Sequence, residues 1–351
     1  MLQYFLRKSF YGLLVMLGVV SIVFALFALL PADAARMTQG QRTDVASLEA
    51  VRKEFGLDKP KHVQFALYLN DVSPISIHEN DSNNQAKYHY LVLIPIKHHA
   101  LVLKYPYLRR SYQTQKKVSD ILMDTIPNTA VLAITSMIFA SIIGIGLGLL
   151  AALNKDTWID KFSMSFAILG VSMPSFFAGI LIAWLFAFIL GPYTGLNMSG
   201  SLYDYNPFTG EEIQVKNLLL PMITLGLRPL AIIVQLTRSS MLDVMQMDYI
   251  RTAKAKGLTP IQVVWRHALK NALNPVITAV SGWFASLMAG AFFVEYIFSW
   301  NGLGKVTVDA LELSDLPVVM GAVLFIAFLF VIVNLMVDLS YSLLDPRIRM
   351  E

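Results

Sequence analysis

The 351-residue sequence contains no cysteine. Disulfide bonds, thiolate zinc sites, covalent haem attachment and cysteine nucleophiles are therefore excluded. Charged residues are also scarce, at 15% of the chain, whereas 56% of the residues are hydrophobic and the mean hydropathy is +0.57. This balance excludes an ordinary water-soluble domain and predicts a membrane protein.

Six long apolar stretches reach or approach the roughly 20 residues that a helix needs to cross the hydrocarbon core. They are Ser9–Leu30, Pro127–Leu153, Phe166–Leu190, Leu218–Leu236, Val276–Phe298 and Pro317–Tyr341. The stretches are apolar on all sides, which favours helices over alternating barrel strands. We therefore predict an all-α, multi-pass protein with six transmembrane helices. Ala32-Asp-Ala34 resembles a signal-peptide cleavage site, but the apolar run before it is too long for a signal core, so we expect it to remain as a span.

The basic residues of the short loops predict the orientation of the chain. Short loops rich in Lys and Arg stay in the cytoplasm. The segments expected there carry Arg7, Lys8, Lys155, Lys161, Arg238, Arg251, Lys254, Lys256, Arg266, Lys270, Arg347 and Arg349. The two short loops on the other side carry only Lys216 and Lys305. Both termini are thus expected in the cytoplasm, and the net charge of +4 indicates membrane topology rather than a nucleic-acid partner.

The segment between the first two spans is too long for a bare connection. We expect three regions, namely an N-terminal transmembrane helix at 1–30, an extracytoplasmic segment at 31–125 and a five-helix core at 126–351. Within the external segment we predict a short helix over Ser47–Phe55, a turn-rich stretch over Asn70–Tyr88 and a strand pair within Tyr90–Tyr107. His98 and His99 are expected on the surface, because no further ligand follows at a metal-binding spacing.

The most informative stretch runs from Asp248 to Pro275 on the cytoplasmic side. We predict a helix that ends at Lys256, a left-handed residue at Gly257, and a second helix that is capped by Thr259 and starts at Pro260. The second helix should carry one apolar stripe, formed by Ile261, Val264, Trp265, Ala268, Leu269 and Ala272. Such a helical hairpin could lie in the membrane interface or dock into a groove on a soluble partner, and the pattern alone leaves both open.

The residues of this hairpin resemble the cytoplasmic EAA loop of ABC-importer permeases, in the form found in the dipeptide and oligopeptide branch. The matching positions are Arg251, Thr252, Ala253, Ala255, Lys256, Gly257 and Leu258, followed by Arg266, His267, Ala268, Leu269, Asn271, Ala272 and Pro275. Together with Thr259, Pro260 and Trp265, these residues form the candidate ATPase-coupling site within a cytoplasmic coupling loop at 237–275.

Other stretches are similar to the same family. They are Pro127-Asn-Thr129, Met173–Gly179, which interrupts the third span, Glu295–Gly304 and Asp338–Arg347. The chain departs from the family at Asn301, where Pro is usual, and at Pro31-Ala-Asp-Ala34. The stretch 72–107 has no counterpart and looks like an insertion.

The resemblance implies a permease subunit with the fold of type I ABC importers, located in the bacterial inner membrane. It implies four kinds of partner besides the lipid membrane, namely a second related permease, two cytoplasmic ATP-binding subunits, and an extracytoplasmic peptide-binding protein. The cargo would be di- or oligopeptides, with nickel chelates or glutathione as alternatives within the family. The cargo itself, the pore-lining residues and the pairing of like or unlike permeases are not readable from one chain.

The resemblance also implies that partner subunits bind ATP and its magnesium ion. We therefore expect this chain to be a transport subunit that is not an enzyme and holds no cofactor, and the sequence agrees with this expectation. The string closest to a phosphate-binding loop ends at Gly304-Lys305-Val306, where Val306 replaces the required hydroxyl. Gly144 and Gly148 lie inside a span, where we expect them to allow close helix packing.

Two charges near or within spans are candidates for the substrate path. An ionisable residue inside a membrane costs several kcal/mol unless it is paired or wetted. Arg228 could meet a peptide carboxylate, or it could pair with Glu295 or a helix carbonyl. Glu295 could equally serve local hydrogen bonding. An ion-coupled secondary transporter is the rival class, and the long cytoplasmic hairpin together with the lack of two matching halves disfavours it.

Overall fold

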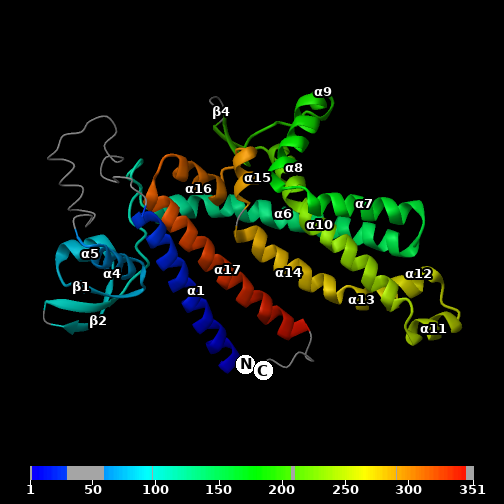
Figure 1. The fold of residues 1–351 in the computed structure, drawn as a ribbon, viewed down its shortest axis with the longest axis horizontal. Helices are drawn as coiled ribbons and strands as arrows, with labels where there is room; N and C mark the ends of the chain where they lie inside the picture. Colours follow the sequence, from blue (N-terminus) through cyan, green and yellow to red (C-terminus); the bar gives the residue numbers. More distant parts are fainter. Residues whose placement is uncertain (1, 30–58, 97, 207–209, 290, 345–351) are drawn as a thin grey trace. The chain divides into compact units, whose positions relative to one another are not determined.

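The computed structural model describes residues 2–29, 59–96, 98–206, 210–289 and 291–344 (Figure 1). The helix predicted over Ser47–Phe55 lies outside these residues. The chain divides into two compact units, one formed by 1–125 with 306–328 and the other by 126–305 with 329–351. Each unit is described by itself.

The first unit combines helices with a small sheet. Its helical elements are α1 (Leu2–Leu29), α4 (Lys61–Val72) and α5 (Ser82–Tyr88), and its strands are β1 (Ile75–Glu79), β2 (Leu91–Ile96) and β3 (His99–Leu103). The strands form an antiparallel sheet in the order β1-β3-β2. The strand pair β2–β3 confirms the prediction for Tyr90–Tyr107. The prediction missed β1 and α5, because their polar, turn-rich sequence hides an alternation of buried Ser76 and His78 with exposed neighbours.

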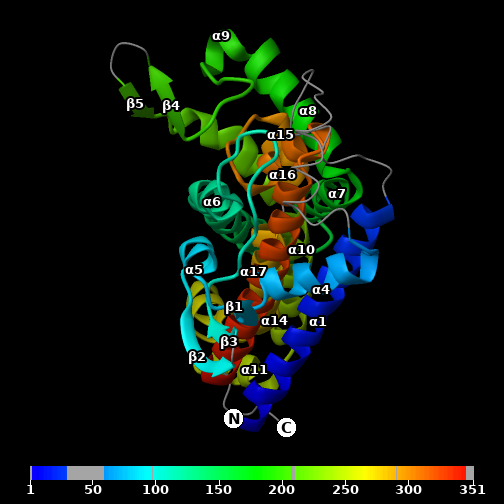
Figure 2. The ribbon, with the colours of Figure 1, turned by 90° about the vertical axis from the view of Figure 1, so that its left-hand side faces the viewer.

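Helix α4 lies across α1 (Figure 2). Buried Val20, Tyr68 and Leu324 form the centre of this contact, and the rings of Phe24 and Phe65 lie 5.1 Å apart. Asp71, at the end of α4, ties the segment that follows to this helix. Its carboxylate accepts hydrogen bonds from Arg109 at 3.1 Å and from the hydroxyl of Tyr88 at 3.0 Å. The described residues that follow α4 therefore form a folded structure anchored on α1 and α4.

The second unit is mainly helical. Its elements are α7 (Trp158–Ser172), α8 (Ser175–Ile182), η1 (Ala183–Ile189), α9 (Gly191–Thr194), β4 (Tyr203–Asn206), β5 (Gly210–Ile213), α10 (Lys216–Val244), α11 (Asp248–Ala255), α12 (Pro260–Val263), η2 (Val264–Ala268), α13 (Leu269–Ala272), α14 (Asn274–Ala289) and α15 (Phe292–Ile297). Three further helices, α6 (Val118–Leu153), α16 (Leu303–Glu312) and α17 (Leu316–Leu344), run from one unit into the other. Strands β4 and β5 form a hairpin.

Among the described residues, four helices are long and apolar enough to cross a membrane, namely α1, α6, α10 and α17. A fifth candidate is the pair formed by α7 and the segment Ser175–Ile189, which is bent by 113°. The sequence placed an interruption here, but the prediction of one span over Phe166–Leu190 missed the start at Trp158 and the size of the bend. Met173 is extended before Pro174, because a residue that precedes proline avoids the helical region. Six spans remain a prediction, since α14 has only 16 residues.

Close glycine contacts join α6 and α7 to α10. A Cβ atom on Gly144 would lie 2.8 Å from the side chain of Ile233, and one on Gly148 would lie 2.6 Å from Thr237. A Cβ atom on Gly170 would lie 3.3 Å from Ala231. The packing role predicted for Gly144 and Gly148 is confirmed. Helix α6 starts at Val118, nine residues before the predicted start at Pro127, because the proline is accommodated inside the helix.

Candidate coupling loop and membrane charges

The hairpin after α10 has the local structure that its sequence predicts. Helix α11 ends at Ala255, and Gly257 follows with φ of +80°. Thr259 caps α12 through a capping box, in which Gln262 N–H donates to the Thr259 hydroxyl at 3.4 Å and Thr259 N–H donates to the Gln262 side chain at 3.1 Å. Pro260 occupies the first helical position. These features fix the direction of the chain on both sides of the tip.

A small apolar core holds the hairpin rigid against the ends of α6 and α10. Its buried members are Ala152, Met241, Val244, Ile250, Ala253, Val263, Val264, Ala268, Leu269 and Ala272. The side chain of Asn271 also donates a hydrogen bond to the Tyr249 hydroxyl at 2.8 Å, joining the two arms. The hairpin and the C-terminal end of α10 therefore form one packed body.

The predicted apolar stripe is only partly correct. Val264, Ala268, Leu269 and Ala272 are buried, but Ile261 is 72% and Trp265 is 63% exposed. Two features explain the difference. First, α12 packs on the core through Val263, which is fully buried, so that Ile261 faces away from it. Second, η2 is a π-helical turn, which changes the helical period and moves Trp265 out of the apolar stripe. Two large apolar side chains thus remain uncovered near the tip.

The other predicted coupling residues lie mainly on the surface. Arg251, Thr252, Ala255, Lys256, Gly257, Thr259, Pro260 and Arg266 are exposed, Leu258 and His267 are half-buried, and Ala253 and Leu269 belong to the core. Arg251 forms an exposed ion pair with Asp248 at 3.4 Å. The structure therefore brings the predicted residues together as one basic and apolar tip above a buried base.

The sequence missed an ion pair at the base of this hairpin. Arg238 of α10 donates two hydrogen bonds to the carboxylate of Asp160 of α7, from Nε at 2.5 Å and from a terminal nitrogen at 2.7 Å. The side chain of Asp160 is only 4% exposed. The available signal was the two acidic residues Asp156 and Asp160 between Lys155 and Lys161, but sequence spacing cannot show that α7 and α10 meet.

Glu295 lies at the opposite end of the second unit, in a network that links α15 to α6. Its carboxylate accepts hydrogen bonds from the Thr129 hydroxyl at 2.8 Å, from Gly304 N–H at 2.6 Å and from Lys305 N–H at 3.1 Å. The last two donors open α16, so Glu295 caps that helix from another element. The Trp300 ring nitrogen donates to the Asn128 carbonyl at 3.0 Å. Glu295 is fully buried. Its contacts agree with a role in local hydrogen bonding, which the sequence offered as the alternative to a place in the substrate path.

Arg228 has a different environment. It lies inside α10, next to Pro229, and its side chain is exposed. Within the described part of the chain it forms neither a hydrogen bond nor an ion pair, and the Glu295 carboxylate that could have paired with it is bonded elsewhere. A charge in an apolar helix needs a partner or water. Among the described residues, Arg228 has no such partner.

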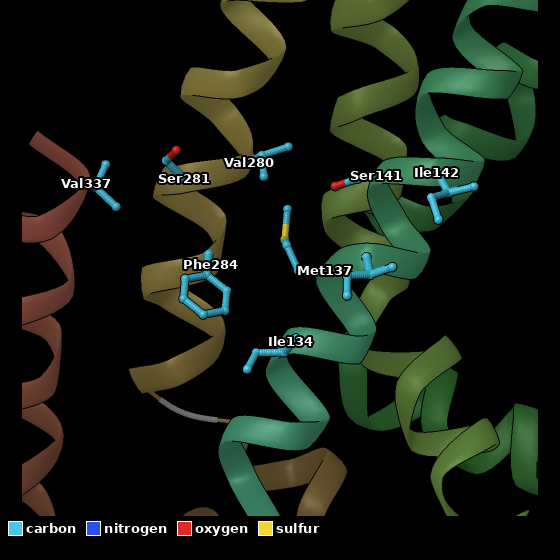
Figure 3. Close-up of a pocket in the computed structure, with 9 residues that line it drawn as sticks. Ile134, Met137, Ser141, Ile142, Val280, Ser281, Phe284 and Val337 are labelled. Atoms are coloured by element: carbon cyan, nitrogen blue, oxygen red, sulfur yellow. The ribbon is translucent and has the colours of Figure 1, made fainter. Parts of the chain in front are cut away.

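A pocket of about 480 Å³ lies among α6, α14 and α17 of the second unit (Figure 3). Its lining is Ile134, Met137, Ile138, Ser141, Ile142, Val280, Ser281, Phe284 and Val337. Two serine hydroxyls are the polar groups of an otherwise apolar wall. Among the described residues, no cluster of His, Asp and Glu could hold a metal ion.

Known proteins resemble this chain over nearly its whole length. Residues 144–350 match the family described as the inner membrane component of binding-protein-dependent transport systems, and residues 1–133 match the N-terminal part of such components. The chain is 33% identical to the dipeptide transport system permease protein of Alkalihalophilus pseudofirmus, over 99% of this chain and 100% of that protein. It is also 33% identical to the glutathione transport system permease protein of Salmonella typhimurium, over 99% of each chain.

A solved structure of an inward-facing methionine ABC transporter superposes with a TM-score of 0.49 at 15% identity, covering 64% of this chain and 96% of that one. The family matches and the full-length relatives confirm the resemblance carried by the hairpin residues. This chain therefore belongs to the family of inner-membrane components of binding-protein-dependent transport systems, and it is a permease subunit of an ABC importer.

Proposed function

We propose that this chain conducts short peptides across the inner membrane and is driven by ATPase subunits that dock on the hairpin. The observation that carries the proposal is the rigid hairpin with an uncovered basic and apolar tip, in a chain whose full-length relatives are named peptide permeases. An exposed tryptophan beside cations is the composition of a protein interface. This composition favours a hairpin that docks to a soluble partner, rather than one that lies in the membrane interface.

The full complex would hold a second related permease, two ATP-binding subunits and an external peptide-binding protein. Each ATP-binding subunit would carry the nucleotide and its magnesium ion. The topology would be six spans with both termini in the cytoplasm. Two observations support this orientation. Ala152 of α6 packs into the hairpin core, and Asp160 of α7 binds Arg238, so Lys155 in the loop and Lys161 at the start of α7 lie at the same end as the basic hairpin.

The mechanism would be mechanical. Closure of the ATPase dimer moves the docked tip, and the buried base passes the displacement to α10, because a packed core moves as a unit. Helix α10 is joined by close glycine contacts to α6 and α7. Movement of the hairpin thereby switches the substrate path from being open on one side of the membrane to being open on the other.

Arg228 would meet the carboxylate of the peptide. Its guanidinium is exposed within α10 and has no ion pair in the described residues, which supports this role, whereas the buried contacts of Glu295 support a structural one. The dipeptide and glutathione relatives are equally similar to this chain, and both cargoes carry free carboxylates. Peptides with a free C-terminus are thus the proposed cargo, with glutathione and nickel chelates as the alternatives to be compared.

The test is transport in proteoliposomes that contain the complete complex. We expect uptake of radiolabelled dialanine that requires ATP and persists when ionophores collapse the proton gradient. Uptake driven by a proton gradient without ATP would overturn the proposal. Arg228→Gln should lower dialanine uptake about tenfold or more, the loss expected for one charge-assisted hydrogen bond. The control Lys161→Gln removes an exposed charge from the start of α7. Unchanged uptake and peptide preference in Arg228→Gln would remove Arg228 from the path.

A further inference from the structure

The ion pair between Asp160 and Arg238 has a geometry that fixes two helices relative to each other. The guanidinium and the carboxylate meet through two parallel hydrogen bonds of 2.5 and 2.7 Å. Such bidentate pairs restrict orientation as well as distance. Asp160 also accepts a hydrogen bond from Asp156 N–H at 2.9 Å, which holds the carboxylate on the turn before α7. The start of α7 is thereby attached to one side of α10.

The pair lies where the hairpin joins the membrane helices. Met241, three residues after Arg238, is fully buried in the core beneath the hairpin. Arg238 therefore stands on the part of α10 that moves with the tip. On the other side of the pair, α7 runs to the 113° bend before Ser175. Beyond the bend, α8 packs against α10 and α15, with Gly179 close to Thr224 and Phe298.

Stability alone is a poor explanation of an ion pair at this place. Removing the Asp160 carboxylate from water costs several kcal/mol, and well-packed apolar residues of similar size often stabilise a protein as well or better. What the pair adds over apolar packing is a fixed geometry. Helix α7 also packs along α10, with a close approach of Gly170 to Ala231, and the ion pair fixes the start of α7 on this packed surface.

We propose that Asp160 and Arg238 are positioning residues for energy coupling. The pair makes α7 follow the displacement of α10 and so carries the movement of the docked hairpin to the bend at Met173–Pro174. This inference rests on the proposed function, because it requires that partner ATPases move the hairpin. It adds a second route into the membrane besides α10 itself.

The experiment measures dialanine molecules taken up per ATP hydrolysed by the complete complex in proteoliposomes. Asp160→Asn and Arg238→Gln should retain ATP hydrolysis but lower this ratio about tenfold, a typical size for the loss of a coupled pair. The charge-swapped double variant Asp160→Arg/Arg238→Asp should recover much of the ratio. Asp243→Asn is the matched control, because it removes an exposed carboxylate from α10 that has no ion pair in the described residues.

The outcomes separate the two proposals. If the unmodified complex shows no ATP-dependent uptake, the proposed function fails and the inference fails with it. If the unmodified complex transports and both single variants keep its ratio, the inference alone is overturned. If the variants only lower the amount of assembled complex, and what assembles transports at the normal ratio, the pair is merely structural and the inference is again overturned. A lowered ratio at normal assembly, restored by the swap, supports it.

Discussion

The carboxylate of Glu295 accepts a hydrogen bond from the hydroxyl of Thr129 at 2.8 Å, and the same hydroxyl accepts one from Leu303 N–H at 2.8 Å. Thr129 thus joins α6 to both α15 and the start of α16. All three groups are buried. A buried acceptor or donor that loses its partner costs about 1–3 kcal/mol.

Thr129→Val is therefore expected to destabilise the protein by about 1–3 kcal/mol, because it keeps the shape of the side chain and removes the hydroxyl. Thr129→Ser keeps the hydroxyl and should retain most of the stability. Thermal unfolding of the purified complex in detergent measures the difference. Equal melting temperatures for the Val and Ser variants would show that the hydroxyl contributes nothing.

The glycines of α6 offer a test of helix packing with a control on the same helix. A Cβ atom on Gly148 would lie 2.6 Å from the Thr237 Cβ and 2.7 Å from the Val234 carbonyl oxygen, whereas one on Gly146 would meet no heavy atom within 4 Å. Gly148→Ala should destabilise the protein by about 1–3 kcal/mol through overpacking. Gly146→Ala should be neutral or stabilising, since alanine favours the helix. Melting temperatures that fall equally in both variants would contradict the close contact.

Local sequence signals predicted the hairpin well. The glycine after Lys256, the cap at Thr259 and the proline that follows it are short-range features, and each determines the backbone of its own few residues. The family motifs, which are also contiguous strings, indicated the permease class. These parts could be predicted because the physics that decides them acts within one or two helical turns.

Long-range contacts could not be predicted in this way. The stripe assignment failed at Trp265 because a π-helical turn changes the helical period without an evident signal in the sequence. The pair Asp160–Arg238 and the link between Thr129 and Glu295 join residues 78 and 166 positions apart. Only packing brings them together. Strand β1 was missed for the same reason, since Ser76 and His78 are buried by other parts of the same unit, such as Tyr88 and Tyr90 against His78, rather than by their own hydrophobicity.

Lys104 gives the folded segment 71–107 a pH dependence. Lys104 is 5% exposed, and burial lowers the pKa of its ammonium group to about 8, against an opposing effect of Asp71 and with a smaller contribution from Lys87. The unfolded chain then binds more protons than the folded one between this pKa and the ordinary value of about 10.4. The folded segment should therefore become more stable as the pH rises from 8 toward 10.

The measurement compares proteolysis within residues 71–107 of the complex at several pH values, with the variant Lys104→Met beside the unmodified protein. The segment 71–107 of the unmodified protein should gain protection relative to Lys104→Met as the pH rises. Lys116→Met is the control, because this exposed lysine of the same unit does not contribute to the lowered pKa of Lys104 and should leave the gain in place. A difference that stays constant with pH would contradict the assignment to Lys104.

Ser281 tests whether the pocket among α6, α14 and α17 faces water. The natural chain has no cysteine, so Ser281→Cys introduces a single thiol. If the pocket wall belongs to the path, a charged, membrane-impermeant thiol reagent should modify Cys-bearing complexes during ATP-driven turnover and block dialanine uptake. The unmodified complex treated with the same reagent is the control. A thiol that reacts only with membrane-soluble reagents would place the pocket against lipid.

Gly257 gives the sharpest test of the coupling tip, because its substitution strains the backbone without creating a collision. Its φ is +80°, and a Cβ atom there would meet no heavy atom within 4 Å. A residue with a Cβ atom in this region costs about 1–2 kcal/mol, and β-branched valine is among the least tolerated. The tip of Gly257→Val should relieve the strain by changing direction, so that ATP is hydrolysed with little peptide uptake while insertion into the membrane stays normal.

The matched control is Gly195→Val. Gly195 ends α9 with φ of +62° and likewise has no heavy atom near a Cβ position, so valine imposes the same kind of strain far from the hairpin along the chain. We expect Gly195→Val to keep the normal ratio of uptake to ATP hydrolysis. If both variants lost coupling to the same extent, general backbone strain would explain the result. If Gly257→Val transported normally, the direction of the tip would not determine how the ATPases engage this subunit.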